Sequence, residues 1–200
     1  DHFRGFESYW EIPFGQTTAI NGKWVKGPGI DFFNKLKEIF GSLNIIAEDL
    51  GILTDDVVKL KEDAGLPGMK ILQFAFDNDP NNDYLPHMYE ENCVVYTGTH
   101  DNDTTQGWYN SLSYSDKDKV KRYLNNYDDL GVVWNLIRLA HSSIAKYSII
   151  PMQDYLCLDS SARINTPGVS SGNWMFRIKD NALSDELANS IAQVTEHYGR

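Results

Sequence analysis

The stretch Asn44-Ile-Ile-Ala-Glu-Asp-Leu-Gly51 is a short apolar run that closes on an acid, Glu48. The stretch Cys93-Val-Val-Tyr-Thr-Gly-Thr-His-Asp101 repeats this arrangement, because Asp101 follows its apolar run. Asp1 opens the chain with no such run before it. Side chains at the carboxyl ends of parallel strands converge on one face of a sheet, so acids that are distant in sequence can meet there. Three such carboxylates suggest chemistry on a glycosidic bond.

Helical and strand-like patterns alternate around these acids. A helix is expected over 31–40, where Gly41 stops it, and Thr54 caps a second helix that ends near Gly65. Further helices are expected over 84–91, 115–127 and 133–144, and after Ser184. Strands are expected over 44–47, 69–76, 93–97 and 147–152. This order predicts the α/β class with a mostly parallel sheet.

Composition narrows the partners and the compartment. The 200 residues are 42% hydrophobic and 23% charged, as in ordinary globular chains, and no interdomain linker stands out, so we expect one domain over 1–200. A net charge of −10 disfavours nucleic acids and anionic membranes, and no apolar run is long enough for a membrane helix. The amino end lacks a secretory pattern, and Cys93 and Cys157 are expected to be buried thiols. A cytoplasmic protein is therefore predicted.

Retaining cleavage of a glycosidic bond needs an attacking carboxylate and a carboxylic acid about 5 to 5.5 Å apart. Asp1 and Glu48 can fill these roles. The acid needs a raised pKa and the nucleophile needs hydrogen-bond donors around it, for which His2 and Arg4 are available. Asp49 should point away from Glu48 and cap or orient the backbone instead.

Each of these residues also has a purely structural interpretation. A single acid at the end of a strand is more often a helix cap, His100 alone would be a structural histidine, and Phe74 alone would be a core residue. Three tryptophans in loop-like segments suit stacking on sugars and packing equally well: Trp10, Trp24 and Trp108. The histidines and cysteines share no metal-ligand spacing, so we expect neither a catalytic metal nor a cofactor.

Several long motifs occur from one end of the chain to the other. They are Asp1-His-Phe-Arg-Gly-Phe-Glu-Ser-Tyr-Trp-Glu-Ile-Pro13, Ile46-Ala-Glu-Asp-Leu-Gly51, Gly65-Leu-Pro-Gly-Met-Lys-Ile-Leu-Gln-Phe-Ala-Phe76, Tyr96-Thr-Gly-Thr-His-Asp-Asn-Asp-Thr-Thr105, Met152-Gln-Asp-Tyr-Leu156, Arg163-Ile-Asn-Thr-Pro-Gly168 and Asn173-Trp174. Together they resemble the 4-α-glucanotransferases, also called amylomaltases or disproportionating enzymes. The resemblance implies Asp1 as nucleophile, Glu48 as general acid/base, and Asp101 as the carboxylate that holds hydroxyls of the donor sugar. That third role fits an oxocarbenium-like transition state, in which such hydrogen bonds can strengthen.

The resemblance also implies substrate contacts and a fold. His2 and His100 should hydrogen-bond the donor sugar, and Phe74 should stack near the acceptor. The substrates would be α-1,4-glucans and maltooligosaccharides. The family's fold is a TIM-type (β/α)8 barrel, of which this chain would supply the C-terminal part, with about five parallel strands. The upstream strands, and an Arg two residues before the nucleophile, would be missing.

Such a partial barrel should be poorly active alone and should self-associate through its uncovered edges. Two other functions remain open at this point. An amylase-type hydrolase would release reducing sugar without longer products. A non-catalytic glucan-binding or assembly fragment would bind glucan without turnover.

Overall fold

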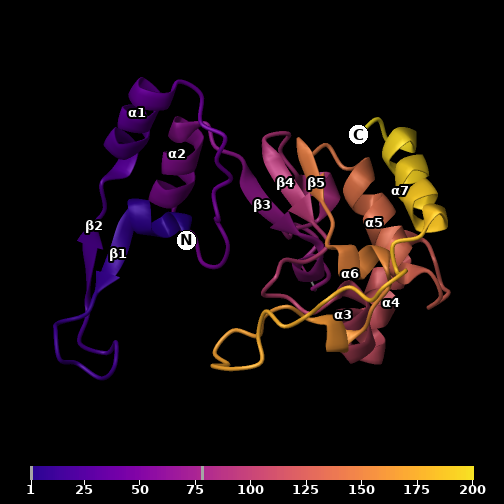
Figure 1. Ribbon diagram of the computed structural model, residues 1–200. Coiled ribbons are helices and arrows are strands. Elements are labelled where there is room, and N and C mark those ends of the chain that lie inside the picture. Colours follow the sequence, from indigo (N-terminus) through magenta and orange to yellow (C-terminus); the bar gives the residue numbers. More distant parts are fainter. Residues whose placement is uncertain (1, 78) are drawn as a thin grey trace. The chain divides into compact units, whose positions relative to one another are not determined.

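The computed structural model describes residues 2–77 and 79–200. They form two compact units, Asp1–Met69 and Lys70–Arg200, each of which is described by itself (Figure 1). The expectation of one domain over 1–200 stays a prediction. None of the described helices is both long and apolar enough to cross a membrane.

The first unit combines a hairpin with two helices. A 3-10 turn, Phe3–Phe6, leads into strands β1 (Ser8–Glu11) and β2 (Lys23–Lys26), which pair antiparallel with Trp10 opposite Trp24. Helices α1 (Gly29–Phe40) and α2 (Asp55–Ala64) follow, close to the predicted positions. Gly65 has a φ of 67°, a left-handed conformation that ends α2 as expected.

The core of the first unit gathers around aromatic rings. Phe3 and Phe33 are buried, with ring centroids 5.6 Å apart, and Val57 of α2 is fully buried in the same cluster. The expected strand over 44–47 is wrong. Ala47 donates its N–H to the carbonyl oxygen of Pro67 at 2.8 Å, but the segment does not form the ladder that defines a strand.

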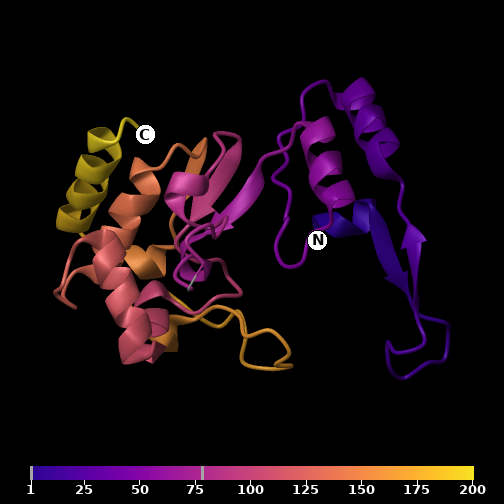
Figure 2. The same cartoon turned by 180° about the vertical axis from the view of Figure 1, so that it is seen from behind.

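The second unit is a three-stranded sheet covered by helices. Its strands are β3 (Gly68–Ile71), which begins in the last two residues of the first unit, β4 (Cys93–Tyr96) and β5 (Tyr147–Ile149). Their order is β3-β4-β5, and β4 runs parallel to β5. The helices are α3 (Thr105–Ser111), α4 (Tyr114–Leu124), α5 (Val132–Ser142), α6 (Met152–Tyr155) and α7 (Asp185–His197). Figures 1 and 2 both place α5 between β5 and α7. The α/β class is therefore confirmed, with three described strands in the sheet where about five were expected.

Buried aliphatic residues explain why α5 lies on the sheet. Val95 of β4 and Leu136 of α5 are almost fully buried in one cluster, and Ile137 of α5 belongs to a second cluster with Val120 of α4. Arg200 then joins the chain after α7 to the end of α5. Its guanidinium donates to the carbonyl oxygens of His141 at 3.0 Å, Ser143 at 2.6 Å and Ala145 at 2.5 Å.

Four local expectations need correction. The expected strand over 69–76 ends at Ile71 and is followed by the 3-10 turn Leu72–Phe74. The expected helix over 84–91 is only a 3-10 turn, Pro86–Met88. The expected strand over 147–152 ends at Ile149, because Pro151 cannot donate to a ladder and instead precedes α6. Cys93 is buried as expected, whereas Cys157 is exposed.

Candidate active site

Within the first unit, the chain beside Asp1 lies against the segment that carries Glu48. Asp1 itself is outside the described residues. Phe3 donates its N–H to the carbonyl oxygen of Glu48 at 2.8 Å, which fixes these two segments side by side. His2 is exposed, and its Nδ1 accepts the N–H of Arg4 at 3.2 Å. The Glu48 side chain is half-buried, so it has both partial desolvation and access to a ligand.

Asp49 is turned into the protein, as expected from its position next to Glu48. Its Oδ2 lies 2.7 Å from Nζ of Lys61, and its Oδ1 accepts the N–H of Met69 at 2.7 Å. Both side chains of this ion pair are largely buried. Gly68 passes so close that a Cβ there would lie 2.1 Å from Oδ2 of Asp49. This fixed carboxylate holds the backbone on which Glu48 is carried.

Arg4, a predicted donor for Asp1, is engaged within the same unit. Its Nη1 donates to the carbonyl oxygen of Ile52 at 2.7 Å, and its guanidinium lies 4.5 Å from the ring centroid of Trp24. Glu7, one turn further on, is buried and accepts from Ser8 and from Lys26, both at 2.5 Å. The hydrogen bond from Lys26, followed by that from Ser8, lowers the pKa of Glu7.

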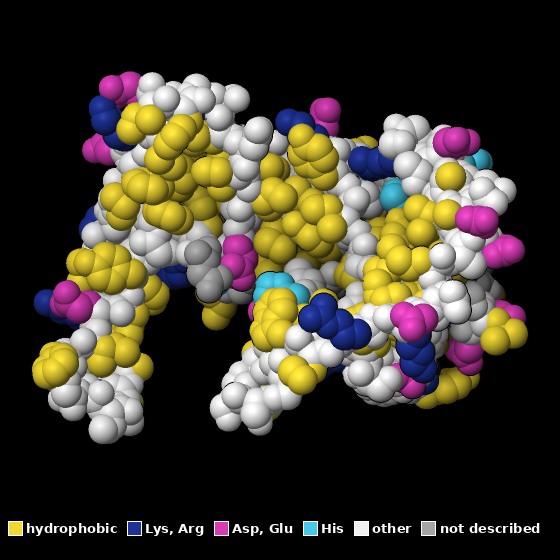
Figure 3. Space-filling model, viewed as in Figure 1, with side chains coloured by type: hydrophobic (Ala, Val, Ile, Leu, Met, Phe, Trp, Pro, Cys, Tyr) yellow, Lys and Arg dark blue, Asp and Glu magenta, His cyan; other side chains and the backbone are white. Residues whose placement is uncertain are grey.

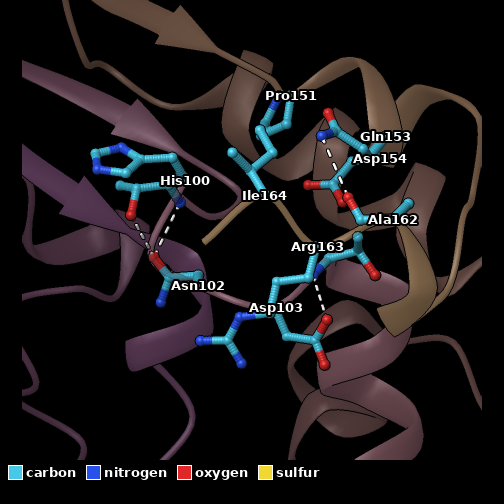
Figure 4. A pocket seen from close by; sticks show the side chains of 11 residues that line it. His100, Asn102, Asp103, Pro151, Gln153, Asp154, Ala162, Arg163 and Ile164 are labelled. Atoms are coloured by element: carbon cyan, nitrogen blue, oxygen red, sulfur yellow. Dashed lines mark hydrogen bonds between the residues drawn. The ribbon is translucent and has the colours of Figure 1, made fainter. Parts of the chain in front are cut away.

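In the second unit, the loop after β4 presents His100 and Asp101. Asn102 shapes this loop, because its Oδ1 accepts from the N–H of Thr99 at 2.9 Å and from the Thr99 hydroxyl at 2.8 Å (Figure 4). The Thr99 hydroxyl also accepts the N–H of Asp101 at 3.3 Å. The strand therefore ends in a tight polar turn that holds the Asp101 backbone.

A loop that is distant in the sequence also holds Asp101 by hydrogen bonds. Asn165 donates through Nδ2 to Oδ1 of Asp101 at 2.5 Å, and Arg163 donates through Nη2 to the Asp101 carbonyl oxygen at 2.7 Å. Nε2 of His100 lies 3.4 Å from the same Oδ1. The Asp101 side chain is nevertheless 46% exposed. It is thus held in one orientation while it stays available to a ligand's hydroxyl groups.

An exposed aromatic ring lies beside the residues that hold Asp101. The Trp174 ring lies 5.2 Å from that of His100, tilted by 34°. The backbone N–H of Trp174 donates to the carbonyl oxygen of Ile164 at 2.7 Å. Arg163, Asn165 and Trp174 belong to motifs of the sequence, but no local pattern there predicts a role for them. Only the folded loop shows that they surround Asp101, since they are more than sixty positions away.

Phe74 lies after β3, in the 3-10 turn Leu72–Phe74, and is 43% exposed. It is therefore not a core residue, and its predicted contact with an acceptor sugar stays a prediction. Its ring packs edge-on against Tyr84 with centroids 5.4 Å apart. The neighbouring Gln73 is buried and donates through Nε2 to the carbonyl oxygen of Asp103 at 2.9 Å, which connects the loops after β3 and β4.

The three tryptophans weighed for stacking differ in setting. Trp108 packs against the buried core of the second unit. Trp10 and Trp24 are exposed on the hairpin and meet edge to face at 5.3 Å. The Trp10 indole donates to the carbonyl oxygen of Ala19 at 2.9 Å, so this ring also fastens the hairpin loop.

Each unit thus places a half-exposed acid on a loop that follows an apolar segment, Glu48 in the first unit and Asp101, beside His100, in the second. The model of the 4-alpha-glucanotransferase family, glycoside hydrolase family 77, matches residues 1–184. This chain belongs to that family.

Individual relatives agree with this assignment. A 4-alpha-glucanotransferase of Clostridium butyricum is 52% identical over all of this chain, and one of Thermus thermophilus is 47% identical over 98% of it. The amylomaltase of Streptococcus agalactiae, solved in complex with acarbose, is 35% identical and superposes over the whole chain with a TM-score of 0.95. The chain spans 41% of the length of each of these three proteins. A relative from Solanum tuberosum, 46% identical, is described as chloroplastic or amyloplastic.

Proposed function

We propose that this chain carries the catalytic carboxylates of a retaining 4-α-glucanotransferase, which moves α-1,4-glucan segments to the 4-hydroxyl of an acceptor sugar. The observation that carries this proposal is the way in which Asp101 is held. A carboxylate fixed by Asn165 yet 46% exposed, next to His100, suits a sugar ring with several hydroxyl groups. The acarbose complex of the Streptococcus agalactiae relative supports a maltooligosaccharide-like ligand.

In the first step, the Asp1 carboxylate attacks the anomeric carbon of the donor glucan. The bond from that carbon to the glycosidic oxygen breaks, and Glu48 gives its proton to the departing oxygen. A covalent glucanyl ester on Asp1 results. In the second step the Glu48 carboxylate takes the proton of the acceptor 4-hydroxyl, whose oxygen displaces Asp1 and restores the original anomeric configuration.

Asp101 and His100 bind the donor sugar in this scheme, and His2 supplies a further hydrogen bond. As the ring flattens toward the transition state, the fixed carboxylate gains stronger hydrogen bonds without having to reorganise. Phe74 offers an exposed ring to the acceptor. Transfer exceeds hydrolysis when the acceptor sugar, and not water, occupies the site during the second step.

The chain is proposed to form the C-terminal part of a (β/α)8 catalytic barrel, placed in the cytoplasm. The superposition on an amylomaltase supports the barrel, as does a second amylomaltase, from Corynebacterium glutamicum, whose TM-score of 0.71 at 15% identity speaks for the fold alone. Figure 3 shows hydrophobic side chains over α1 and the hairpin. Phe32 of α1 and Trp24 of β2 are among the exposed hydrophobic residues. Such a surface suits packing against further barrel elements or against a second copy.

Maltotriose tests the function. The 200-residue chain is assayed alone and as a chimaera in which it replaces the matching 41% of the Clostridium butyricum relative. We expect the chimaera to produce glucose and a ladder of longer maltooligosaccharides, and Glu48→Gln to abolish both. The chain alone should be poorly active. Reducing sugar without longer products would instead support the hydrolase, and binding without turnover in the chimaera would support a binding fragment.

A further inference from the structure

Asp154, in α6, is a buried carboxylate that the mechanism above does not use. Its side chain is almost fully buried, with the residue 1% exposed. Oδ2 accepts from the Thr97 hydroxyl at 2.5 Å and from the Thr105 hydroxyl at 2.7 Å, and Oδ1 accepts the Thr105 N–H at 2.8 Å. All of these partners are neutral donors, and both threonines are themselves buried.

The two threonines mark the ends of the loop that carries His100 and Asp101. Thr97 directly follows β4, and Thr105 is the first residue of α3. One carboxylate therefore closes both ends of the segment 97–105, and this removes much of the freedom that such a loop would otherwise have. Asn102 shapes the same loop from within.

A small cavity lies between Asp154 and the part of the loop that carries His100. Its volume is about 30 Å³, which is enough for a water molecule, and its lining includes Thr99, His100, Asn102 and Asp154 (Figure 4). In Figure 4 the Asp154 and His100 side chains lie on different sides of this space. The loop is thus supported from behind by Asp154.

Burying a carboxylate costs free energy, and burial raises the pKa of Asp154 even though its hydrogen bonds oppose that shift. Apolar side chains could pack these segments together without the free-energy penalty of burying a charged group. A carboxylate is well suited here because it accepts at both oxygens and so fixes a backbone N–H and two hydroxyls at once. The desolvation penalty of Asp154 is understandable if the loop has to be held within a fraction of an ångström.

We propose that Asp154 is a positioning residue, which fixes both ends of the loop 97–105 and so holds the Asp101 carboxylate where the donor sugar binds. This inference rests on the proposed function for its catalytic consequence. Its structural part, the restraint of the loop, can be tested without any activity.

The first test is amide hydrogen exchange on the 200-residue chain. Asp154→Ala removes all three acceptor contacts, and exchange of the amides from 98 to 105 should accelerate at least tenfold. The matched control is Asp129→Ala, since Asp129 also anchors α3, by accepting from the Tyr109 hydroxyl at 2.5 Å. Exchange in 98–105 should be unchanged in the control.

A milder variant covers the case in which Asp154→Ala does not fold. Thr97→Val keeps the shape of the side chain and removes only the contact at the β4 end. It should accelerate exchange near 98–101 more than at 105. Unchanged exchange across the loop in a folded Asp154→Ala or Thr97→Val protein would overturn the proposal.

The second test is kinetic and uses the chimaera with maltotriose. Asp154→Asn retains the size of the side chain but offers one acceptor oxygen in place of two. We expect kcat to fall about tenfold to a hundredfold, because a small displacement of a catalytic group has an effect of this size, while KM changes less than threefold. An equal fall in Asp129→Asn would contradict a specific positioning role. If the unmodified chimaera transfers no glucan, the proposed function fails, and hydrogen exchange still decides the restraint of the loop.

Discussion

Asp101 illustrates how one residue can be both fixed and accessible. Its backbone is held by Thr99 and by Arg163, and one carboxylate oxygen is held by Asn165, while nearly half of the side chain faces solvent. The sequence pointed to Asp101 because it follows an apolar run. The residues that hold it come from a loop with no regular pattern, so a pattern search had no means of finding them.

Asp101→Asn should therefore reduce glucan transfer without unfolding the protein. The amide keeps the oxygen that accepts from Asn165 but loses the negative charge that stabilises the transition state, so kcat/KM in the chimaera should fall roughly a hundredfold or more. The control is Asp118→Asn, an acid on α4 whose partner is Arg122. Initial rates with maltotriose and thermal melting measure the two effects. Equal rates for the two variants would refute the assigned role.

His141 should make stability depend on pH. It is buried at the end of α5, its Nε2 lies 3.1 Å from the Tyr155 hydroxyl, and burial, followed by the charge of Arg200, lowers its pKa below 6.5. The unfolded chain therefore binds a proton more readily, so the free energy of unfolding should decrease as the pH falls below about 6.5. Denaturant unfolding between pH 7.5 and 5 measures this.

The comparison variant is His141→Gln, which keeps a polar side chain without a titrating ring. Its unfolding free energy should vary less over the same pH range. An identical pH dependence in the two proteins would show that other groups control it.

Among the elements, α5 depends on a side chain far away in sequence. The last carbonyl groups of a helix lack partners within it, and Arg200 donates to three carbonyls at or just past the end of α5. Arg200→Ala should lower the free energy of unfolding by about 1–3 kcal/mol, because those carbonyls lose charged donors. Arg200→Lys should recover only part of this loss, since an ammonium group cannot reproduce the planar fork. Chemical denaturation measures both, and full recovery with lysine would contradict the geometric argument.

Element by element, the sequence was informative where the signal was local. Helices α1 and α2 follow from apolar spacing and from Gly41 and Gly65 at their ends. The hairpin was missed because its strands have only four residues each, although Gly22 and Trp24 are typical of a turn and a strand. The segment 44–47 has the composition of a strand without the ladder, and composition cannot show which partner a strand finds.

For the whole molecule, two separate cores imply two separable stabilities. Val57 lies in the core of the first unit and Val95 in that of the second, and both are fully buried. Val57→Ala and Val95→Ala should each cost about 1–3 kcal/mol in the affected unit, from lost burial and the cavity left behind.

Hydrogen exchange resolves these effects by position. Val57→Ala should accelerate exchange in α2 and leave β4 and α5 nearly unchanged, and Val95→Ala should do the reverse. Matching acceleration in both units from either variant would show that they unfold as one cooperative body.

For the whole molecule, the α/β class and the family could be predicted from the alternating patterns and the long motifs, but the hydrogen bond between Asp154 and Thr97 could not. The two positions are 57 residues apart, and a lone acid in a short helix has no periodic neighbour to reveal that it is buried. Contacts of this kind arise only when the chain folds, since they depend on which loops the sheet brings together.

Gly68 is twenty residues from Glu48 in the sequence, yet a substitution there should disturb the proposed acid/base. Since even a methyl group there would collide with the Asp49 carboxylate, every substitution must dislodge the neighbour of the proposed acid/base. Anyone who randomises this protein for new acceptors should leave that position alone. Conversely, Gly68→Ala should abolish turnover while every group proposed to contact the sugar is chemically unchanged.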